Sequence, residues 1–301
     1  EVAQRIAIEA TEIFNGKDAN FNIILDIIDK HKAGLPENKI DSVTSNIGEL
    51  LNELNKTTKW KFNIPILQEN VSGLGAGNLA IIFARPEAGK TAFWVSLVGG
   101  KGGFAEQGAI VHAFINEEPA VRTQMRIINC CTGLTNAQIA ENLEEAHSEW
   151  KKIKNNITLI DTIDWTLDDI DSHCEKYKPD IIVIDQLDKI GIKGTFARGD
   201  EKLRAIYSGA REISKRRQNC VIAISQASAD AHNRSSISFD MMENSKTGKA
   251  SEADLIIGIG RNINIDPTDR TRHLCISKNK ITGWHGEPDC VFDKHISRYR
   301  A

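Results

Sequence analysis

Apolar positions recur with one spacing near the start of the chain and with another after about residue 58. In the first stretch the spacing is helical and appears three times: in residues 2–13, in residues 21–28, and at Ile47, Leu50, Leu51 and Leu54. Asp41 or Ser42 is the expected N-cap of the third helix. Helices this short cannot enclose a core. We therefore predict that residues 1–58 form a helical linker or oligomerisation arm, which packs on the main domain or on a neighbouring subunit.

From residue 59 to residue 301, short apolar runs alternate with longer amphipathic segments. The runs predict strands at residues 79–84, 109–115, 157–160, 181–184, 221–225, 255–259, 273–277 and 289–292. The amphipathic segments predict helices at residues 91–98, 120–131, 136–152, 167–177 and 201–217. Apolar strands that alternate with helices are typical of an α/β fold, a mostly parallel twisted sheet flanked by helices. Two long polar stretches, residues 191–200 and 227–251, are predicted to be functional loops.

Composition narrows the class of protein. Hydrophobic residues make up 41% and charged residues 26% of the 301 residues, which is typical of a globular protein. No apolar run approaches the roughly 18 residues of a membrane helix, and the start of the chain does not resemble a signal peptide. The six cysteines form no CxxC pair, so we predict neither a zinc site nor disulfides, and a cytoplasmic location. The net charge of −3 excludes a uniformly basic surface but allows nucleic-acid binding through local loops.

The strongest chemical signal is a glycine-lysine-threonine sequence between a predicted strand and a predicted helix, which is the context of a phosphate-binding loop. Backbone N–H groups of such a loop cradle phosphates, the lysine neutralises the β- and γ-phosphates, and the threonine coordinates Mg²⁺. The alternative is an ordinary helix start, and Ala84 stands where the usual pattern has its first glycine. The predicted nucleotide-binding residues are Arg85, Pro86, Glu87, Ala88, Gly89, Lys90, Thr91 and Ala92, with Thr91 also a metal ligand.

Three further polar residues follow predicted strands. Asp185 ends the run of residues 181–184, and we predict that it is the second metal-holding carboxylate, on a strand neighbouring the phosphate loop; a strand-end cap is the alternative. Glu117 is the predicted general base, although it and Glu118 also suit the start of the next helix. Gln226 is a candidate sensor of the γ-phosphate or a plain turn residue.

The order of these motifs resembles the hexameric replicative helicases of the DnaB type, whose motor is a RecA-like ATPase. The resemblance runs from about residue 71 to the end, and its motifs are residues 84–91, 114–117, 182–185, 222–226 and 253–256. The C-terminal motifs, residues 259–262, 278–283 and 292–294, are closer to phage primase-helicases.

The resemblance implies residue roles that spacing alone does not give. Lys278 and Lys280 correspond to positions that reach the γ-phosphate of a neighbouring subunit, although the family usually has arginine at the position of Lys280. Arg261 and Phe292 correspond to residues that sandwich the adenine base; a core phenylalanine is the alternative for Phe292. The two polar stretches correspond to channel loops that hold single-stranded DNA. Their cations are Lys193, Arg198, Arg234, Lys246 and Lys249, and for each of them a solvated loop charge is the alternative.

The sequence therefore predicts the motor of a bacterial or phage replicative DNA helicase. It would use ATP and Mg²⁺, assemble into a homo-hexameric ring around single-stranded DNA, and work with a primase module or a primase partner. Two rivals remain: a RecA-like recombinase that forms ATP-switched filaments, and a RecA-like regulatory ATPase without a nucleic-acid role.

Overall fold

The computed structural model describes residues 2–16, 23, 24, 27, 45–243, 246–261 and 268–300. The chain divides into two compact units, Glu1–Leu50 and Leu51–Ala301. In the first unit the helix expected at residues 2–13 is α1 (Val2–Phe14). The helix expected at residues 21–28 and the caps Asp41 and Ser42 lie largely or wholly outside the described residues.

The helix expected from Ile47 onward is α3 (Ile47–Thr57). Its first turn donates hydrogen bonds to the side chain of Asn46, which lies closer to the helix than the expected caps Asp41 and Ser42. The Asn46 side-chain oxygen accepts hydrogen bonds from the backbone N–H groups of Gly48, at 2.9 Å, and Glu49, at 3.3 Å. These N–H groups have no intrahelical partner, so a side-chain acceptor there stabilises the start of the helix.

The second unit contains a small sheet and a large one. Strands β1 (Trp60–Lys61) and β2 (Gly73–Leu74) pair with each other around α4 (Pro65–Val71). The remaining strands form one sheet: β3 (Leu79–Ala84), β4 (Val111–Ile115), β5 (Ile157–Asp161), β6 (Ile181–Asp185), β7 (Cys220–Gln226), β8 (Leu255–Gly260), β9 (Thr271–Asn279), β10 (Asp289–Asp293) and β11 (Arg298–Arg300). The helices of this unit after α4 are α5 (Lys90–Gly99), α6 (Ala120–Thr132), α7 (Asn136–Glu141), α8 (Leu143–Ile153), α9 (Leu167–Tyr177), α10 (Gly199–Arg217) and α11 (Lys246–Glu252).

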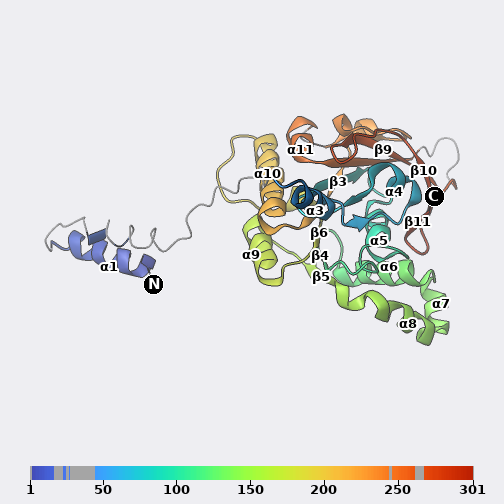
Figure 1. The fold of residues 1–301 in the computed structure, drawn as a ribbon, viewed down its shortest axis with the longest axis horizontal. Coiled ribbons are helices and arrows are strands. Elements are labelled where there is room, and N and C mark those ends of the chain that lie inside the picture. The colour runs from blue at the N-terminus through green and yellow to red at the C-terminus, as the bar shows by residue number, and fades with distance from the viewer. Residues whose placement is uncertain are drawn as a thin grey trace. The chain divides into compact units, whose positions relative to one another are not determined.

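The strand order in the large sheet is β11-β10-β9-β8-β3-β7-β6-β4-β5. The strands from β8 to β5 in this order are parallel, which confirms the expected fold class. The red strands of Figure 1 extend the sheet in antiparallel pairs, β9 with β8, and β10 with β9 and β11. Within the described residues no helix separates β9 from β10 or β10 from β11, so the chain turns back beside the strand before it. Strand β7 lies between β3 and β6, so the expectation that Asp185 ends a strand next to β3 is wrong by one strand.

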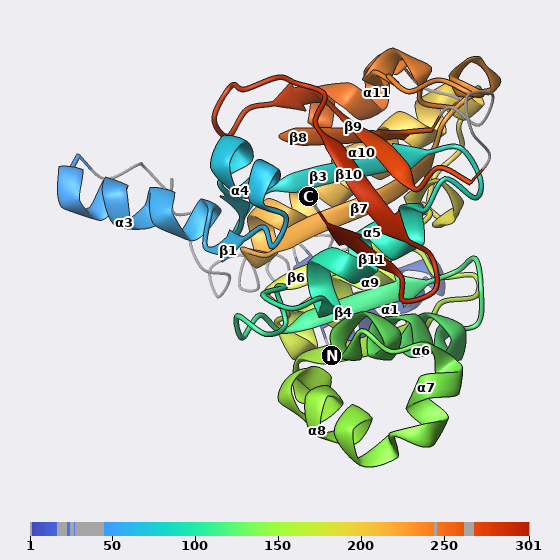
Figure 2. The same cartoon turned by 90° about the vertical axis from the view of Figure 1, so that its right-hand side faces the viewer.

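The core lies on both faces of the parallel strands, and β3 shows how one strand serves both. Leu79, Ile81 and Phe83 pack with α9 and α10, whereas alternate residues Ala80 and Ile82 pack with α5 and α6. In Figure 2, α5 lies in front of the sheet and α10 behind it. Strands buried on both faces read as continuous apolar runs, and for this reason the sequence predicts them well.

Other elements differ from the sequence-based expectation. The single helix expected at residues 136–152 is two helices, because Asn142 has non-helical backbone angles. The loop expected at residues 227–251 contains α11 and buries Ile237 and Met242 in the core. Among the described residues, no helix is both long and apolar enough to span a membrane.

Candidate nucleotide-binding site

The segment between β3 and α5 has the backbone shape of a phosphate-binding loop. Gly89 has a φ of 105°, a left-handed conformation that favours glycine, and it is the N-cap of α5. A Cβ on Gly89 would lie 2.5 Å from the Tyr299 hydroxyl and 3.1 Å from the Phe292 ring. Glycine is therefore required here both by the backbone angle and by the close approach of the C-terminal strands. Gly89 and the first three residues of α5, Lys90, Thr91 and Ala92, line an adjoining cleft, and the start of a helix favours an anion.

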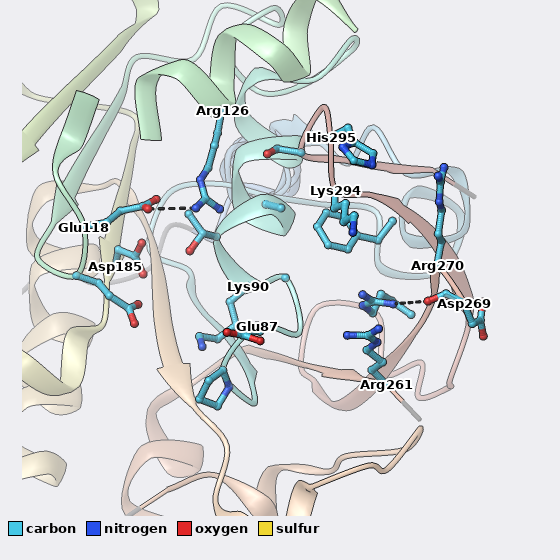
Figure 3. Close-up of a pocket in the computed structure, with 18 of the residues that line it drawn as sticks. Glu87, Lys90, Glu118, Arg126, Asp185, Arg261, Asp269, Arg270, Lys294 and His295 are labelled. Atoms are coloured by element: carbon cyan, nitrogen blue, oxygen red, sulfur yellow. Dashed lines mark hydrogen bonds and ion pairs between the residues drawn. The ribbon is translucent and has the colours of Figure 1, made fainter. Parts of the chain in front are cut away.

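The cleft has a volume of about 800 Å³ and is lined by the carboxyl ends of the parallel strands and by β10. Lys90 and Asp185 both line it and both are buried, Asp185 completely (Figure 3). Burial lowers the pKa of Lys90, while the charges of Glu117 and Asp185 oppose that change. Burial and the nearby charge of Glu117 raise the pKa of Asp185 to about 6. The cleft thus holds two charged groups that the protein itself solvates poorly.

The side-chain oxygens that line the cleft are suitable ligands for a magnesium ion. Neither carboxylate oxygen of Asp185 makes a hydrogen bond of normal geometry with the described residues, although both are buried and the Trp94 indole N–H lies nearby and favours the ionised form. Thr91, at the second position of α5, lines the same cleft. Within the described part of the chain no cluster of three or more His, Cys, Asp or Glu side chains could hold a metal. Mg²⁺ is usually held by one or two protein oxygens together with waters and phosphates, and the Thr91 hydroxyl and the Asp185 carboxylate are oxygens of that kind.

Two adjacent glutamates after β4 have different environments. The Glu118 carboxylate accepts hydrogen bonds from Arg126, at 3.1 Å, and from Thr123, at 3.2 Å; Figure 3 marks the first of these bonds. The Glu117 side chain is exposed to the cleft and makes no hydrogen bond or ion pair within the described residues. A general base needs a free lone pair, so the geometry favours Glu117 over Glu118.

The C-terminal strands build the far wall of the cleft and support the loop. The Arg272 guanidinium is buried and donates to the Ala88 carbonyl at 3.0 Å, and the Tyr299 hydroxyl donates to the Gly89 carbonyl at 3.3 Å. Phe292 lines the cleft but is 9% exposed, because its ring stacks on Tyr299 with centroids 4.8 Å apart. Arg261 also lines the cleft. The adenine-binding role of Arg261 and Phe292 stays a prediction.

Sequence reasoning missed several residues of this wall and of α6. They are polar or charged and come from segments without a recognised phosphate-binding pattern: Arg126, Thr268, Asp269, Arg270, Arg272, Lys294, His295 and Ser297. Only Lys294 carried a signal, since it belongs to one of the C-terminal motifs. Arg126 reaches the cleft from α6, and the remaining residues reach it because β9, β10 and β11 fold back beside the loop.

Most of the residues predicted to bind nucleotide or to take part in catalysis line the cleft, but five of them do not. The Arg85 guanidinium donates a hydrogen bond to the Ala227 carbonyl at 3.0 Å. The side chain of Ala88, within the loop, is buried in the core. Gln226 pairs with Ala84 across β3 and β7, which puts it at the level where the loop begins. Lys278 and Lys280 lie at and just after the end of β9, outside the cleft of their own subunit. A role in another subunit's site stays a prediction for both.

The predicted DNA-contacting cations divide into exposed and buried ones. Lys193 and Arg198 are exposed and form ion pairs with neighbouring acids, Asp168 and Asp200 respectively, each at 2.8 Å or less. Arg234 is exposed, and the side chain of Lys246 lies outside the described residues. Lys249 corrects the sequence-based expectation, because its side chain is fully buried and is hydrogen bonded within the core. Its ammonium cannot meet DNA in this conformation.

In this cleft a buried lysine lies on the first turn of a helix that follows a parallel strand, and a buried carboxylate lies in the same cleft. This arrangement is suited to a nucleoside triphosphate and its metal. The fold and the site thus define a P-loop ATPase of the RecA-like class. Residues 61–301 match the family model of the DnaB-like helicase C terminal domain. The chain belongs to this family, and the resemblance seen in its motifs is confirmed.

Individual relatives agree with this assignment. The chain is 26% identical to the replicative DNA helicase DnaB of Haemophilus influenzae over 254 residues, which are 77% of this chain and 53% of the relative. It therefore spans about half the length of this curated relative. A solved DnaB-like replicative helicase, studied with its interactions with primase, superposes with a TM-score of 0.74 at 19% identity, covering 100% of this chain and 76% of that one. A second solved structure, of an ATPase domain, superposes with a TM-score of 0.68 at 19% identity, covering 94% of this chain and 99% of that one.

Proposed function

We propose that this protein is the ATP-driven motor of a replicative DNA helicase. The observation that carries the proposal is the cleft in which Lys90, Glu117 and the unpartnered oxygens of Asp185 come together at the end of the phosphate loop. Lys90 and the loop N–H groups would bind the β- and γ-phosphates of ATP, and Thr91 and Asp185 would hold Mg²⁺. The metal would neutralise charge on the phosphates.

Glu117 would accept the proton of the attacking water, because its carboxylate is free and faces the cleft. Gln226 would sense the γ-phosphate from the end of β7. Lys278 and Lys280 would complete the site of the neighbouring subunit in a homo-hexameric ring, a role that agrees with their place outside their own cleft. A lysine there supplies charge without the planar fork of an arginine.

We further propose that exposed cations of the ring contact single-stranded DNA. Lys193, Arg198 and Arg234 are exposed in segments that follow β6 and β7, the strands that also carry Asp185 and Gln226. Repetition of a few such charges around a ring gives a basic channel in an acidic protein. Residues 1–58 would act as the linker that packs on a neighbouring subunit, and a primase would be the partner. A bacterial or phage-infected cytoplasm is the proposed location.

The proposal is tested by measuring ATPase activity with and without single-stranded DNA, together with the size of the assembly and displacement of a duplex strand. A ring with DNA-stimulated hydrolysis and strand displacement is the expected result. Filaments that pair strands would identify a recombinase instead. Hydrolysis that ignores single-stranded DNA would identify a regulatory ATPase.

The shared site has its own test, in which Lys280→Ala subunits are mixed with Glu117→Gln subunits. Each variant alone should be nearly inactive. A mixed ring contains interfaces that join the intact Glu117 of one variant to the intact Lys280 of the other, so part of the DNA-stimulated ATPase activity should return. Lys280→Arg should be tolerated. If Lys280→Ala alone keeps full activity, Lys280 has no role in trans.

A further inference from the structure

A buried polar network joins α11 to the strands that end at the nucleotide cleft. The Lys249 ammonium donates to Oδ2 of Asp188 at 2.8 Å and to the Ser225 hydroxyl at 3.1 Å. Asp188 lies three residues after Asp185, and Ser225 directly precedes Gln226. Lys249 is therefore attached to the ends of β6 and β7, next to the residues proposed to hold the metal and to sense the γ-phosphate.

Asp188 receives donors from three separate elements. Besides Lys249 of α11, the Ser225 hydroxyl of β7 donates to it at 2.8 Å and the Tyr207 hydroxyl of α10 donates at 2.9 Å. Burying an ion pair contributes little net stability compared with apolar packing of the same volume, but it fixes the relative positions of its partners. The network thus defines where α11 stands relative to β6, β7 and α10.

The residues of α11 that follow Lys249 hold Lys278. The Lys278 ammonium donates to the carbonyl of Ala250 and, at 3.3 Å, to that of Ser251. These are carbonyls of the last turn, which lack partners within the helix. An ammonium has three N–H groups, so two hold the helix and one remains for another acceptor. Burial and the neighbouring charge of Lys280 lower the pKa of Lys278, as expected for an ammonium held against the protein.

We propose that α11 is a positional link between two nucleotide sites, and that Lys249 is its positioning residue. Lys249 bonds to Asp188 and Ser225 and so fixes the position of α11 relative to the nucleotide site of its own subunit. The carbonyls of Ala250 and Ser251 in α11 then fix the position of the Lys278 ammonium, which acts at the nucleotide site of the neighbouring subunit. This inference rests on the proposed function, in which Lys278 acts in trans. Lys249 itself touches neither nucleotide.

The link predicts that Lys249→Met lowers hydrolysis at the neighbour's site and leaves the subunit's own site competent. We expect the kcat of the DNA-stimulated ATPase to fall about ten- to a hundredfold, since misplacing one charged group can cost that much. The KM for ATP should not change. The matched control is Lys152→Met on α8, an exposed lysine that pairs with Glu149, and it should behave as the parent protein.

The decisive measurement mixes each variant with Lys90→Ala subunits, which cannot hydrolyse ATP but keep Lys249 and Lys278 intact. If Lys249→Met acts through Lys278, the Lys90→Ala neighbour supplies a correctly placed lysine, and turnover per Lys249→Met subunit rises on mixing. Lys278→Met should respond in the same way.

Three results would overturn the link. Parent-level activity of Lys249→Met shows that Lys278 needs no positioning by it. A defect that mixing does not relieve, while mixing relieves Lys278→Met, shows that Lys249 acts on its own site; the proposed function then stands. If mixing relieves neither variant, the trans role of Lys278 fails and the link fails with it. If Lys249→Met folds poorly, Asp188→Asn is the second variant. It removes the charge that pairs with Lys249 and keeps one amide oxygen, which can accept from either Tyr207 or Ser225, and it should lower kcat in the same way.

Discussion

Two buried aspartates at opposite ends of the sheet differ in how fully the protein satisfies them. Asp254 precedes β8 and meets the Arg211 guanidinium in a bidentate pair, with the second bond at 2.9 Å, and also accepts from the Leu79 N–H at 3.0 Å. Asp185, at the carboxyl end of β6, is 0% exposed and makes no hydrogen bond of normal geometry through either oxygen within the described chain. One carboxylate is saturated by the protein, and the other is not.

This difference distinguishes Asp254, a buried charge that stabilises the fold, from Asp185, a buried charge that is available to a ligand. A buried carboxylate without donors costs free energy, so it persists only if something outside the chain compensates it in the working state. Asp254 joins α10 to the start of β3 and β8, and both of its oxygens accept hydrogen bonds from the protein. Asp185 keeps its lone pairs and lies in a cleft with Lys90 and Thr91.

The largest expected effect is the loss of ATP turnover in Lys90→Ala. Removal of the loop's buried cation leaves the phosphates under-neutralised, and turnover should fall by more than about 10³-fold. The melting temperature should not fall, because Lys90 is a poorly solvated charge whose pKa burial lowers. ATPase assays and thermal unfolding check both parts. Hydrolysis at the parent rate would show that the phosphate loop is misassigned.

The same contrast separates the two glutamates of the cleft. Glu117→Gln should lower turnover by about 10²–10⁴-fold while ATP still binds, because an amide cannot accept the proton of water. Glu118→Gln is the matched control, and it should reduce turnover far less, because the Glu118 carboxylate is already bonded to Arg126 and Thr123. Single-turnover hydrolysis and nucleotide binding distinguish the two effects. A larger loss in Glu118→Gln would transfer the role of base to that residue.

At the saturated end, Arg211→Met should damage the fold and leave the chemistry intact. It strands the Asp254 carboxylate without its charge partner, and breaking a buried pair costs about 3–5 kcal/mol in the free energy of unfolding. Urea unfolding measures the loss. Arg216→Met, which breaks a more exposed pair on the same helix, is the control and should cost about 0–1 kcal/mol. Equal losses would mean that Asp254 is not saturated in solution.

The smallest effect concerns the pH dependence of Asp185. Its pKa is raised to about 6, so between about pH 4 and pH 6 the folded protein keeps a proton that the unfolded chain has lost. Stability should therefore fall as the pH rises through this window, and the ionised carboxylate should cost about 3 kcal/mol above it.

Asp185→Asn cannot ionise, so in the absence of nucleotide it should exceed the parent in unfolding free energy at pH 8. The advantage should vanish below about pH 4. Urea unfolding of both proteins across this range measures the difference. Asp254→Asn, the matched control, should be less stable than the parent at pH 8. An Asp185→Asn variant that is also less stable there would remove the distinction between the two aspartates.

The amino-acid sequence by itself determined the parallel core and the residues of the phosphate loop. Strands buried on both faces must be apolar throughout, and a loop that cradles phosphates needs glycine, lysine and threonine at fixed positions, so both leave local signals. Residues 79–84 and Lys90 could therefore be recognised without coordinates. The choice between Glu117 and Glu118 could only be narrowed, because neighbouring residues share the same local pattern.

Which charged side chains are exposed and which are buried in ion pairs or hydrogen bonds became clear from the tertiary structure. Lys249 has the local sequence of a loop cation, yet the chain buries it against Asp188, which is 61 residues away. Arg272 reaches the phosphate loop across 184 residues because the antiparallel strands fold back beside β8. The pairing and burial of a charged side chain depend on contacts between segments that are far apart in the sequence. The local sequence around the side chain does not indicate these contacts.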